Sequence, residues 1–95
     1  MITLNDQEVV ITGKIAFDNA EQLYKEGLKL IQNSKQFPMI FNLSGLENGS
    51  TLALAVLVRW LRQAPDISSI QFKDVPDKML KIIQSCHLEH DIKLI

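Results

Sequence analysis

Residues 42–58 read Asn-Leu-Ser-Gly-Leu-Glu-Asn-Gly-Ser-Thr-Leu-Ala-Leu-Ala-Val-Leu-Val, the segment with the strongest structural signal in the chain. An apolar strand ends near Leu43, a polar loop follows, and a pair of hydroxyl residues opens an apolar helix. Ser50 is a preferred N-cap, because its side-chain oxygen can accept a hydrogen bond from an amide of the first turn. Gly49 permits a sharp backbone turn just before it. We therefore expect the function of the chain to depend on this turn.

Thr51 is predicted to lie in the first turn of that helix, with its hydroxyl close to the loop. The helix N-terminus carries a partial positive charge, so a hydroxyl placed there can contact a partner or accept a phosphate. The alternative is that Ser50 and Thr51 only cap the helix, which such residues routinely do. The residues alone leave both roles open.

The composition predicts one small globular domain, residues 1–95. With 46% hydrophobic and 22% charged residues, a chain of 95 residues can bury a single modest core. A formal net charge of −1 gives no reason to expect nucleic acid as a partner. The first residues lack the features of a signal peptide, and the single cysteine, Cys86, has no internal partner for a disulfide. We expect a cytoplasmic protein.

Before the central segment, the sequence predicts a β-hairpin and an amphipathic helix. Residues 3–4 and 8–12 are typical of two short strands, and Asp18 and Asn19 are candidate helix caps. The polar side of the helix, which includes Glu21, is predicted to face solvent. Its apolar side recurs at helical spacing and consists of Ala20, Leu23, Tyr24, Leu28 and Ile31.

The central strand and the helix after it are both expected to be buried. Residues 38–43 form a nearly continuous apolar run, which predicts the middle strand of a sheet covered on both faces. Residues 52–58 are apolar on almost every side, so this helix must pack against the sheet and at least one other element. The apolar run is too short to cross a membrane, because Arg59 and Arg62 interrupt it. Pro65 ends the helix.

The remaining segments complete an alternating order. Residues 69–73 alternate between apolar and polar and predict a strand, and residues 91–95 predict a short final strand. Between them lies a predicted helix, with Cys86 on its core face. The expected order is β-β-α-β-α-β-α-β, an α/β fold with a mixed β-sheet packed with α-helices and parallel neighbours joined by right-handed crossovers.

At these residues the chain resembles the STAS domain, named after sulphate transporters and anti-sigma-factor antagonists. The resemblance covers nearly the whole chain and is carried by the strand end Asn42-Leu43-Ser44 and the helix start Ser50-Thr51-Leu52-Ala53-Leu54. STAS domains typically place a serine or threonine at the start of this helix as a phosphoacceptor or partner contact. The resemblance assigns that position to Thr51.

Within the family, the chain is most similar to the small cytoplasmic STAS subunits of Mla-type phospholipid ABC transporters. Those subunits also carry a threonine followed by a Leu/Ala-rich helix. The resemblance implies a non-catalytic subunit at the inner face of the inner membrane that binds the transporter's ATPase, and through it the permease. It would thereby support lipid asymmetry of the outer membrane. Our hypothesis is that Thr51 docks on the ATPase together with the loop residues Glu47, Asn48, Gly49 and Ser50, and that Arg59 lies at the flank of the contact.

The sequence also departs from the STAS pattern. Ser50 replaces the usual aspartate and Ala53 the usual glycine, which alters the setting of a kinase substrate and favours a constitutive hydroxyl contact. Asn42 replaces another aspartate, yet its side chain can still accept hydrogen bonds from the neighbouring loop. The alternative function is an anti-sigma-factor antagonist, whose kinase partner would phosphorylate Thr51 or Ser50.

Other chemistry finds little support in the sequence. Residues 86–90 read Cys-His-Leu-Glu-His, but a zinc site needs about four ligands and no second cluster is present. Cys86 is a weak candidate nucleophile, because adjacent residues on a helix point in different directions. No glycine-rich phosphate loop occurs. We expect neither a catalytic site, nor a metal, nor a cofactor.

Overall fold

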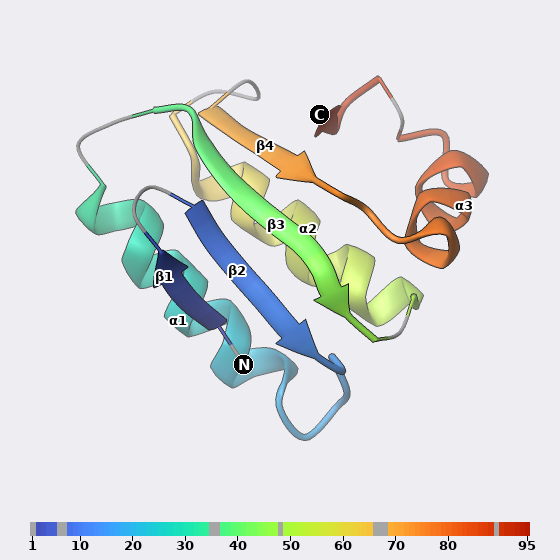
Figure 1. The fold of residues 1–95 in the computed structure, drawn as a ribbon, viewed down its shortest axis with the longest axis horizontal. Helices are drawn as coiled ribbons and strands as arrows, with labels where there is room; N and C mark the ends of the chain where they lie inside the picture. The colour runs from blue at the N-terminus through green and yellow to red at the C-terminus, as the bar shows by residue number, and fades with distance from the viewer. Residues whose placement is uncertain (1, 6–7, 35–36, 48, 66–68, 89) are drawn as a thin grey trace.

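The computed structural model describes residues 2–5, 8–34, 37–47, 49–65, 69–88 and 90–95, which form a mixed five-stranded sheet and three helices (Figure 1). The order β-β-α-β-α-β-α-β agrees with the prediction. The elements are β1 (Ile2–Asn5), β2 (Glu8–Gly13), α1 (Ala20–Asn33), β3 (Met39–Leu46), α2 (Thr51–Gln63), β4 (Ile70–Lys73), α3 (Asp77–Ser85) and β5 (Lys93–Leu94).

The strands lie in the sheet in their sequence order, β1-β2-β3-β4-β5, so β3 is the middle strand as predicted. β1 pairs with β2 in an antiparallel hairpin, and every later pair is parallel. The parallel pairs need long crossovers, which α1, α2 and α3 provide. As a consequence β2, β3 and β4 all end at the same edge of the sheet, where the loops leading to the helices begin (Figure 1).

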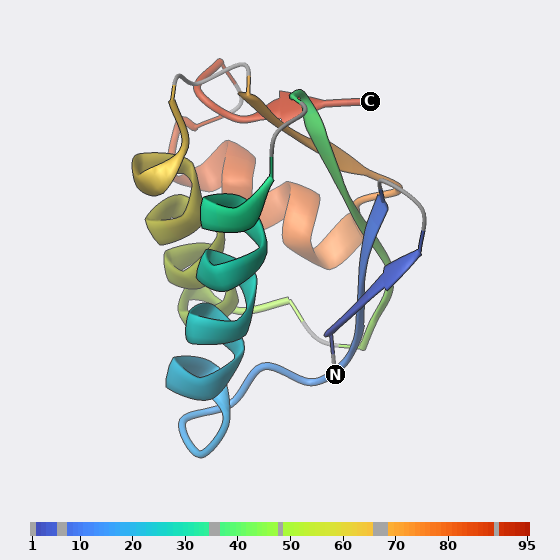
Figure 2. The same cartoon turned by 90° about the vertical axis from the view of Figure 1, so that its left-hand side faces the viewer.

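α1 and α2 pack against one face of the sheet, and no described element covers the other face (Figure 2). The burial of β3 follows this arrangement. Phe41 and Leu43 are fully buried, whereas Ile40 and Asn42, which point the other way, are half-exposed. The prediction that β3 is covered on both faces is therefore wrong. The apolar run suggested burial on both faces, but only alternate residues of β3 lie under the helices.

The centre of the core is an aromatic cluster under α2. The rings of Phe41 and Trp60 are 5.0 Å apart at an interplanar angle of 53°, and those of Phe41 and Phe72 are 5.9 Å apart. Trp60 Nε1 also donates a hydrogen bond of 2.9 Å to the backbone oxygen of Tyr24 in α1. Trp60 therefore fixes α1 against α2 as well as packing on the sheet.

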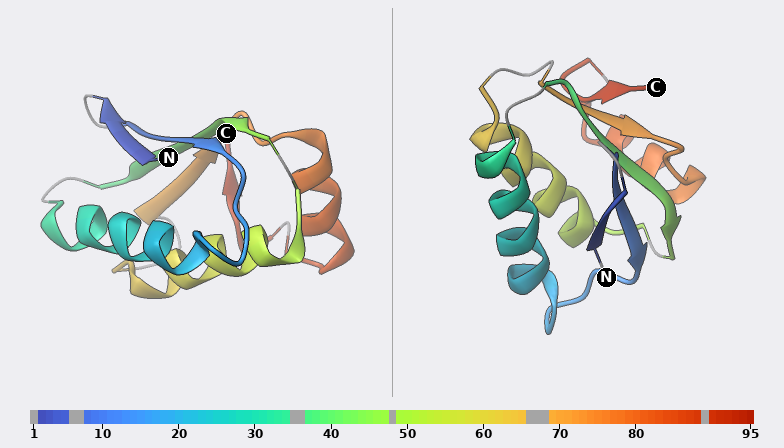
Figure 3. Two further views of the ribbon diagram at one scale, coloured as in Figure 1. Left: turned by 90° about the horizontal axis from the view of Figure 1, so that it is seen from below. Right: turned by 60° about the vertical axis from the view of Figure 1, so that its left-hand side comes forward.

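α2 lies between α1 and α3 and packs on the sheet, which confirms that this apolar helix needed more than one neighbour (Figure 3). Its buried residues share the side that faces the sheet and α1, and they are Ala53, Leu54, Val56, Leu57 and Trp60. The opposite side carries exposed residues, among them Thr51, Ala55 and Arg59. One long side of α2 is thus left uncovered by the described part of the chain.

Two local predictions differ from the structure. Asn19 is the N-cap residue of α1 as predicted, but its side chain makes no capping bond, because its oxygen accepts a hydrogen bond of 2.8 Å from the amide of Ala16 instead. Cys86 is exposed rather than buried, since α3 ends at Ser85 and the chain turns away. In addition, β3 continues to Leu46, beyond the end predicted at Leu43.

Candidate partner-binding site

The polar turn after β3 is tied to the end of the neighbouring strand. The amide of Glu47 donates a hydrogen bond of 2.8 Å to the carbonyl oxygen of Gly13, the last residue of β2. The side chain of Glu47 is exposed. Asn48, another predicted contact residue, lies outside the described residues. The turn therefore starts from a fixed point at the edge of the sheet.

Gly49 lies against the first turn of α3. A Cβ atom at Gly49 would lie 2.8 Å from the carbonyl carbon and the Cβ of Lys78, and 2.9 Å from the amide nitrogen of Met79. These distances are too short for a real Cβ, so the missing side chain allows the turn to approach α3. The sequence suggested backbone freedom at Gly49, and the structure adds a requirement for space.

Ser50 caps α2 as predicted. Its backbone is extended, with φ −156° and ψ 162°, and its Oγ accepts a hydrogen bond of 3.0 Å from the amide of Ala53. The cap satisfies one of the amides that a helix N-terminus leaves without an intrahelical partner. The Ser50 hydroxyl is thus occupied within the chain, and it is half-buried.

Thr51 is the first residue of α2 and is exposed. Because Ser50 supplies the capping bond, the Thr51 hydroxyl is not needed for it. The Thr51 side chain lies at the surface, beside the amides of the first turn. It lies at one end of a shallow hollow of about 390 Å³ that it lines together with Leu54, Ala55 and Cys86, among others. A partner that reaches the Thr51 hydroxyl therefore also meets the uncovered side of α2.

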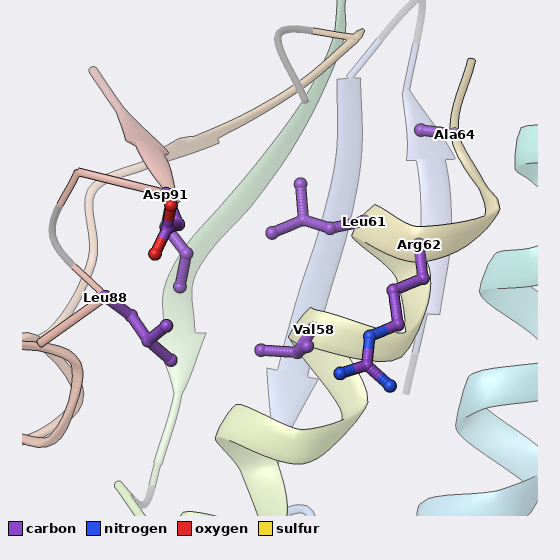
Figure 4. A pocket seen from close by; sticks show the side chains of 7 residues that line it. Val58, Leu61, Arg62, Ala64, Leu88 and Asp91 are labelled. Carbon is purple, nitrogen blue, oxygen red and sulfur yellow. The ribbon is translucent and has the colours of Figure 1, made fainter. Parts of the chain in front are cut away.

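A groove continues from this hollow along α2, and we call it the α2 groove. A second hollow, of about 360 Å³, adjoins the first, and both are lined by Val58, Arg62 and Leu88. Figure 4 shows Val58 and Leu61 on α2 facing Leu88 and Asp91, which belong to the segment after α3. The walls are mainly apolar, and Arg62 and Asp91 are charged residues among them.

Arg59 bridges α2 and α1. Its Nη1 lies 2.8 Å from Oε2 of Glu21, and its guanidinium carbon lies 3.7 Å from the centre of the Tyr24 ring. This hydrogen bond holds the pKa of the Glu21 carboxyl below its ordinary value and raises the pKa of the Arg59 guanidinium. Glu21 is therefore paired with Arg59 rather than only solvated as predicted. Arg59 also lines the α2 groove, and its charge there is already paired with that of Glu21.

Comparison with known proteins identifies the family. The family model described as "Mlab, STAS domain" matches residues 1–95. The chain belongs to this STAS-domain family. The predicted STAS fold is confirmed, and the whole described structure can be interpreted as a STAS domain.

Two solved structures share both fold and sequence with this STAS domain. A subunit of the Acinetobacter MlaFEDB complex in its ATP-bound Vtrans2 conformation is 56% identical, with a TM-score of 0.93, over 100% of this chain and 99% of that one. The same complex in its ATP-bound Vtrans1 conformation gives 57% identity and a TM-score of 0.90, over 96% of each chain. No curated protein sequence matches this chain significantly.

A more distant likeness concerns the fold alone. An anti-sigma factor antagonist from Mycobacterium paratuberculosis is 16% identical with a TM-score of 0.78, over 99% of this chain and 81% of that one. The anti-sigma factor antagonist SpoIIAA in its unphosphorylated form is 13% identical with a TM-score of 0.73, over 100% of this chain and 86% of that one. Such low identity supports the STAS architecture and nothing finer.

The departures from the STAS pattern have visible structural roles. Asn42 accepts a hydrogen bond of 2.9 Å from the amide of Ser44, so it keeps the acceptor role expected of it, although the donor lies within β3. Ser50 keeps the capping role that an aspartate also performs. The lost charge at position 50 makes the start of α2 less acidic around Thr51.

The sequence did not predict the far wall of the α2 groove. Leu88, Asp91 and Ile92 come from the segment between α3 and β5, about two fifths of the chain length away from Thr51. Leu88 amide donates a hydrogen bond of 3.0 Å to the carbonyl oxygen of Ile83, which turns the chain back toward α2. No local sequence pattern predicts that these residues lie opposite α2.

Neither a membrane-spanning helix nor a metal-binding cluster is found among the described residues. No helix among them is long and apolar enough to cross a membrane. No group of three or more His, Cys, Asp or Glu side chains in the described part of the chain could hold a metal ion. Glu89, part of the Cys-His-Leu-Glu-His stretch, lies outside that part.

Gly49→Ala is expected to destabilise the STAS domain by about 1–3 kcal/mol, the usual range for overpacking a close contact. The added methyl group would meet the backbone of Lys78 and Met79, which can move only with α3. Urea denaturation measures the loss. The matched control is Glu47→Ala on the same turn, which removes an exposed side chain and should change stability by no more than about 0.5 kcal/mol. Equal stability of the two variants would contradict the close contact.

Proposed function

We propose that this chain is a non-catalytic subunit that binds the ATPase of a phospholipid ABC transporter and supports the transporter's assembly and activity. One observation carries the proposal: over its whole length the chain is 56% identical to a subunit of the MlaFEDB complex in an ATP-bound conformation. Through the ATPase it would join the permease at the cytoplasmic face of the inner membrane. Its contribution there would be to outer-membrane lipid asymmetry.

The surface at the start of α2 suits such a contact. Thr51 offers a hydroxyl donor and acceptor at one end, and the α2 groove offers apolar area beside it. Protein interfaces typically combine an apolar centre with polar groups at the rim. The Arg59–Glu21 pair at the flank would hold its geometry without the partner, since both charges are satisfied within the chain. Glu47, Gly49 and Ser50 would position Thr51.

The test is binding of purified chain to the purified ATPase subunit of the same transporter, measured by titration calorimetry. Thr51→Glu is expected to weaken binding at least about tenfold, because it places a charge in a desolvated contact. The variant should fold normally, since an acidic residue in the first turn is favourable for a helix. Gln63→Glu is the control, because it adds the same charge at an exposed position in the last turn of α2.

Each result of the titration has a separate meaning. Normal binding by Gln63→Glu with weak binding by Thr51→Glu would support docking through Thr51. Undiminished binding by Thr51→Glu would reject that docking mode while leaving the subunit role intact. If the wild-type chain does not bind the ATPase at all, the proposed function is wrong.

The exposure of Thr51 also favours testing the second function, an anti-sigma-factor antagonist switched by phosphorylation. A kinase could reach the exposed Thr51 hydroxyl, whereas the Ser50 side chain is half-buried and its oxygen already accepts the amide of Ala53. Mass spectrometry of the chain isolated from its host distinguishes the two functions. Phosphate on Thr51 together with a copurifying kinase-like anti-sigma factor would favour the switch, and an unmodified chain with a copurifying ATPase would favour the transporter.

A further inference from the structure

Phe17 is the most exposed large apolar side chain among the described residues. It is 93% exposed, against 54% for Leu4 and for Ile95 and 39% for Phe37. Burying a phenylalanine side chain is favourable relative to leaving it in water. A single exposed apolar side chain is by itself common on protein surfaces, so the place of Phe17 in the fold decides whether it marks a contact.

The loop that carries Phe17 is held in place by hydrogen bonds. The Asn19 side chain accepts a bond of 2.8 Å from the amide of Ala16 and donates one of 2.8 Å to the carbonyl oxygen of Lys14. The amide of Ala20 donates a bond of 2.8 Å to the carbonyl oxygen of Ala16. These bonds close the loop on both sides of Phe17. The ring is therefore presented outward by an ordered turn.

The residue before this turn faces the opposite way. Ile15 is 2% exposed and belongs to the core, so it anchors the loop from inside. Ile15 thus takes the core position on one side of Phe17, and α1 begins at Ala20 on the other. In this conformation only another molecule can bury the Phe17 ring.

The Phe17 loop adjoins the turn that carries Thr51. Phe17 follows the end of β2, and the Thr51 turn follows the end of the neighbouring parallel strand β3. The hydrogen bond from the Glu47 amide to the Gly13 carbonyl oxygen joins the two loops at their bases. Figures 1 and 3 show both loops at the same end of the molecule. The Phe17 loop thus lies next to the turn at one end of the proposed contact surface.

We infer that Phe17 is an anchor residue for the ATPase, inserting its ring into an apolar hollow of that partner beside the Thr51 contact. This inference rests on the proposed function and extends its surface from α2 to the β2–α1 loop. Aromatic side chains are enriched among the few residues that supply most of the energy of an interface. A protein occupant fits better than a membrane, because Lys14 and Asp18 in this loop have opposite charges and form no basic patch.

The experiment compares Phe17→Ser with Leu4→Ser in titrations against the purified ATPase subunit. Leu4 is an exposed apolar residue on β1, and it pairs with Val9 in the first half of β2, away from the Phe17 loop. Phe17→Ser is expected to weaken ATPase binding at least about tenfold, and Leu4→Ser to leave it within about twofold. Phe17→Trp should retain most of the affinity. The thermal midpoint of Phe17→Ser should equal that of the wild type, because the ring contacts so little of its own chain.

Three results would overturn the inference. If Phe17→Ser binds the ATPase as the wild type does while Thr51→Glu does not, Phe17 is no anchor and the proposed function stands. If Phe17→Ser instead loses binding to anionic phospholipid vesicles, or loses a self-association seen for the wild type by sedimentation, with its ATPase affinity unchanged, the ring serves a membrane or a second copy. If the wild-type chain does not bind the ATPase, the proposed function and this inference fail together.

Discussion

The Trp60→Ala variant is expected to lose about 3–5 kcal/mol of unfolding free energy, the range for truncating a fully buried aromatic residue. Trp60 is 0% exposed, and its ring lies 5.0 Å from that of Phe41. Removing the indole leaves a cavity between α1, α2 and the sheet, and it also removes the hydrogen bond to the Tyr24 carbonyl oxygen. Urea denaturation followed by far-ultraviolet circular dichroism measures the loss, because Trp60 is the single tryptophan and its fluorescence disappears with it.

The control for this prediction is Trp60→Phe. A phenyl ring can still pack on Phe41 but cannot donate to Tyr24, so the variant should lose less than half as much stability as Trp60→Ala. A loss of under about 1 kcal/mol in Trp60→Ala, below the range for large core truncations, would mean that the indole does not connect α1 to α2.

The second large effect is expected for Gly27→Ala. This substitution should lower the free energy of unfolding, although a change from glycine to alanine inside a helix usually raises it. Alanine in place of glycine inside a helix normally stabilises by about 1 kcal/mol. In α1, however, a Cβ at Gly27 would lie 2.4 Å from Cε2 of Trp60 and 2.5 Å from its Cζ2 and Nε1. The buried indole has no free space in which to move, so we expect a net loss of about 1–3 kcal/mol. Thermal and urea denaturation measure it.

A double-mutant cycle tests the cause of that loss. Combining Gly27→Ala with Trp60→Phe should cost less than the sum of the two single changes, because the smaller ring leaves room for the added methyl group. Lys25→Ala, at an exposed position of the same helix, controls for helix propensity alone. A Gly27→Ala variant that is more stable than the wild type would show that α1 and α2 can move apart without cost.

Most elements of the fold could be predicted because their signals are local. Ser50 caps α2 through an amide three residues away, and the apolar spacing from Ala20 to Ile31 follows one face of α1. The apolar run of residues 38–43 also placed β3 correctly in the middle of the sheet, although it wrongly implied that both faces are covered. At Asn19 the pattern found the N-cap position but not the hydrogen bond, because the amide of Ala16 donates to the side-chain oxygen instead.

Only the α2 wall of the candidate site was predicted from the sequence. Thr51 and Ser50 could be found because the hydroxyl residues stand where a helix begins. The opposite wall of the α2 groove could not, since Leu88 and Asp91 approach Val58 only after α3 has packed. Phe17 was overlooked for a related reason. A lone phenylalanine in a loop gives no sign of its exposure until Ile15 takes the core position beside it.

The sequence alone specifies the order of the elements, the cap at Ser50 and the position of Thr51, because each depends on residues within one or two turns of the chain. Packing between distant segments specifies the rest. It pairs Arg59 with Glu21, which is 38 residues away, makes Gly27 and Gly49 sites of close approach, and places no described element on one face of the sheet. These features depend on distances between elements, which local periodicity does not encode.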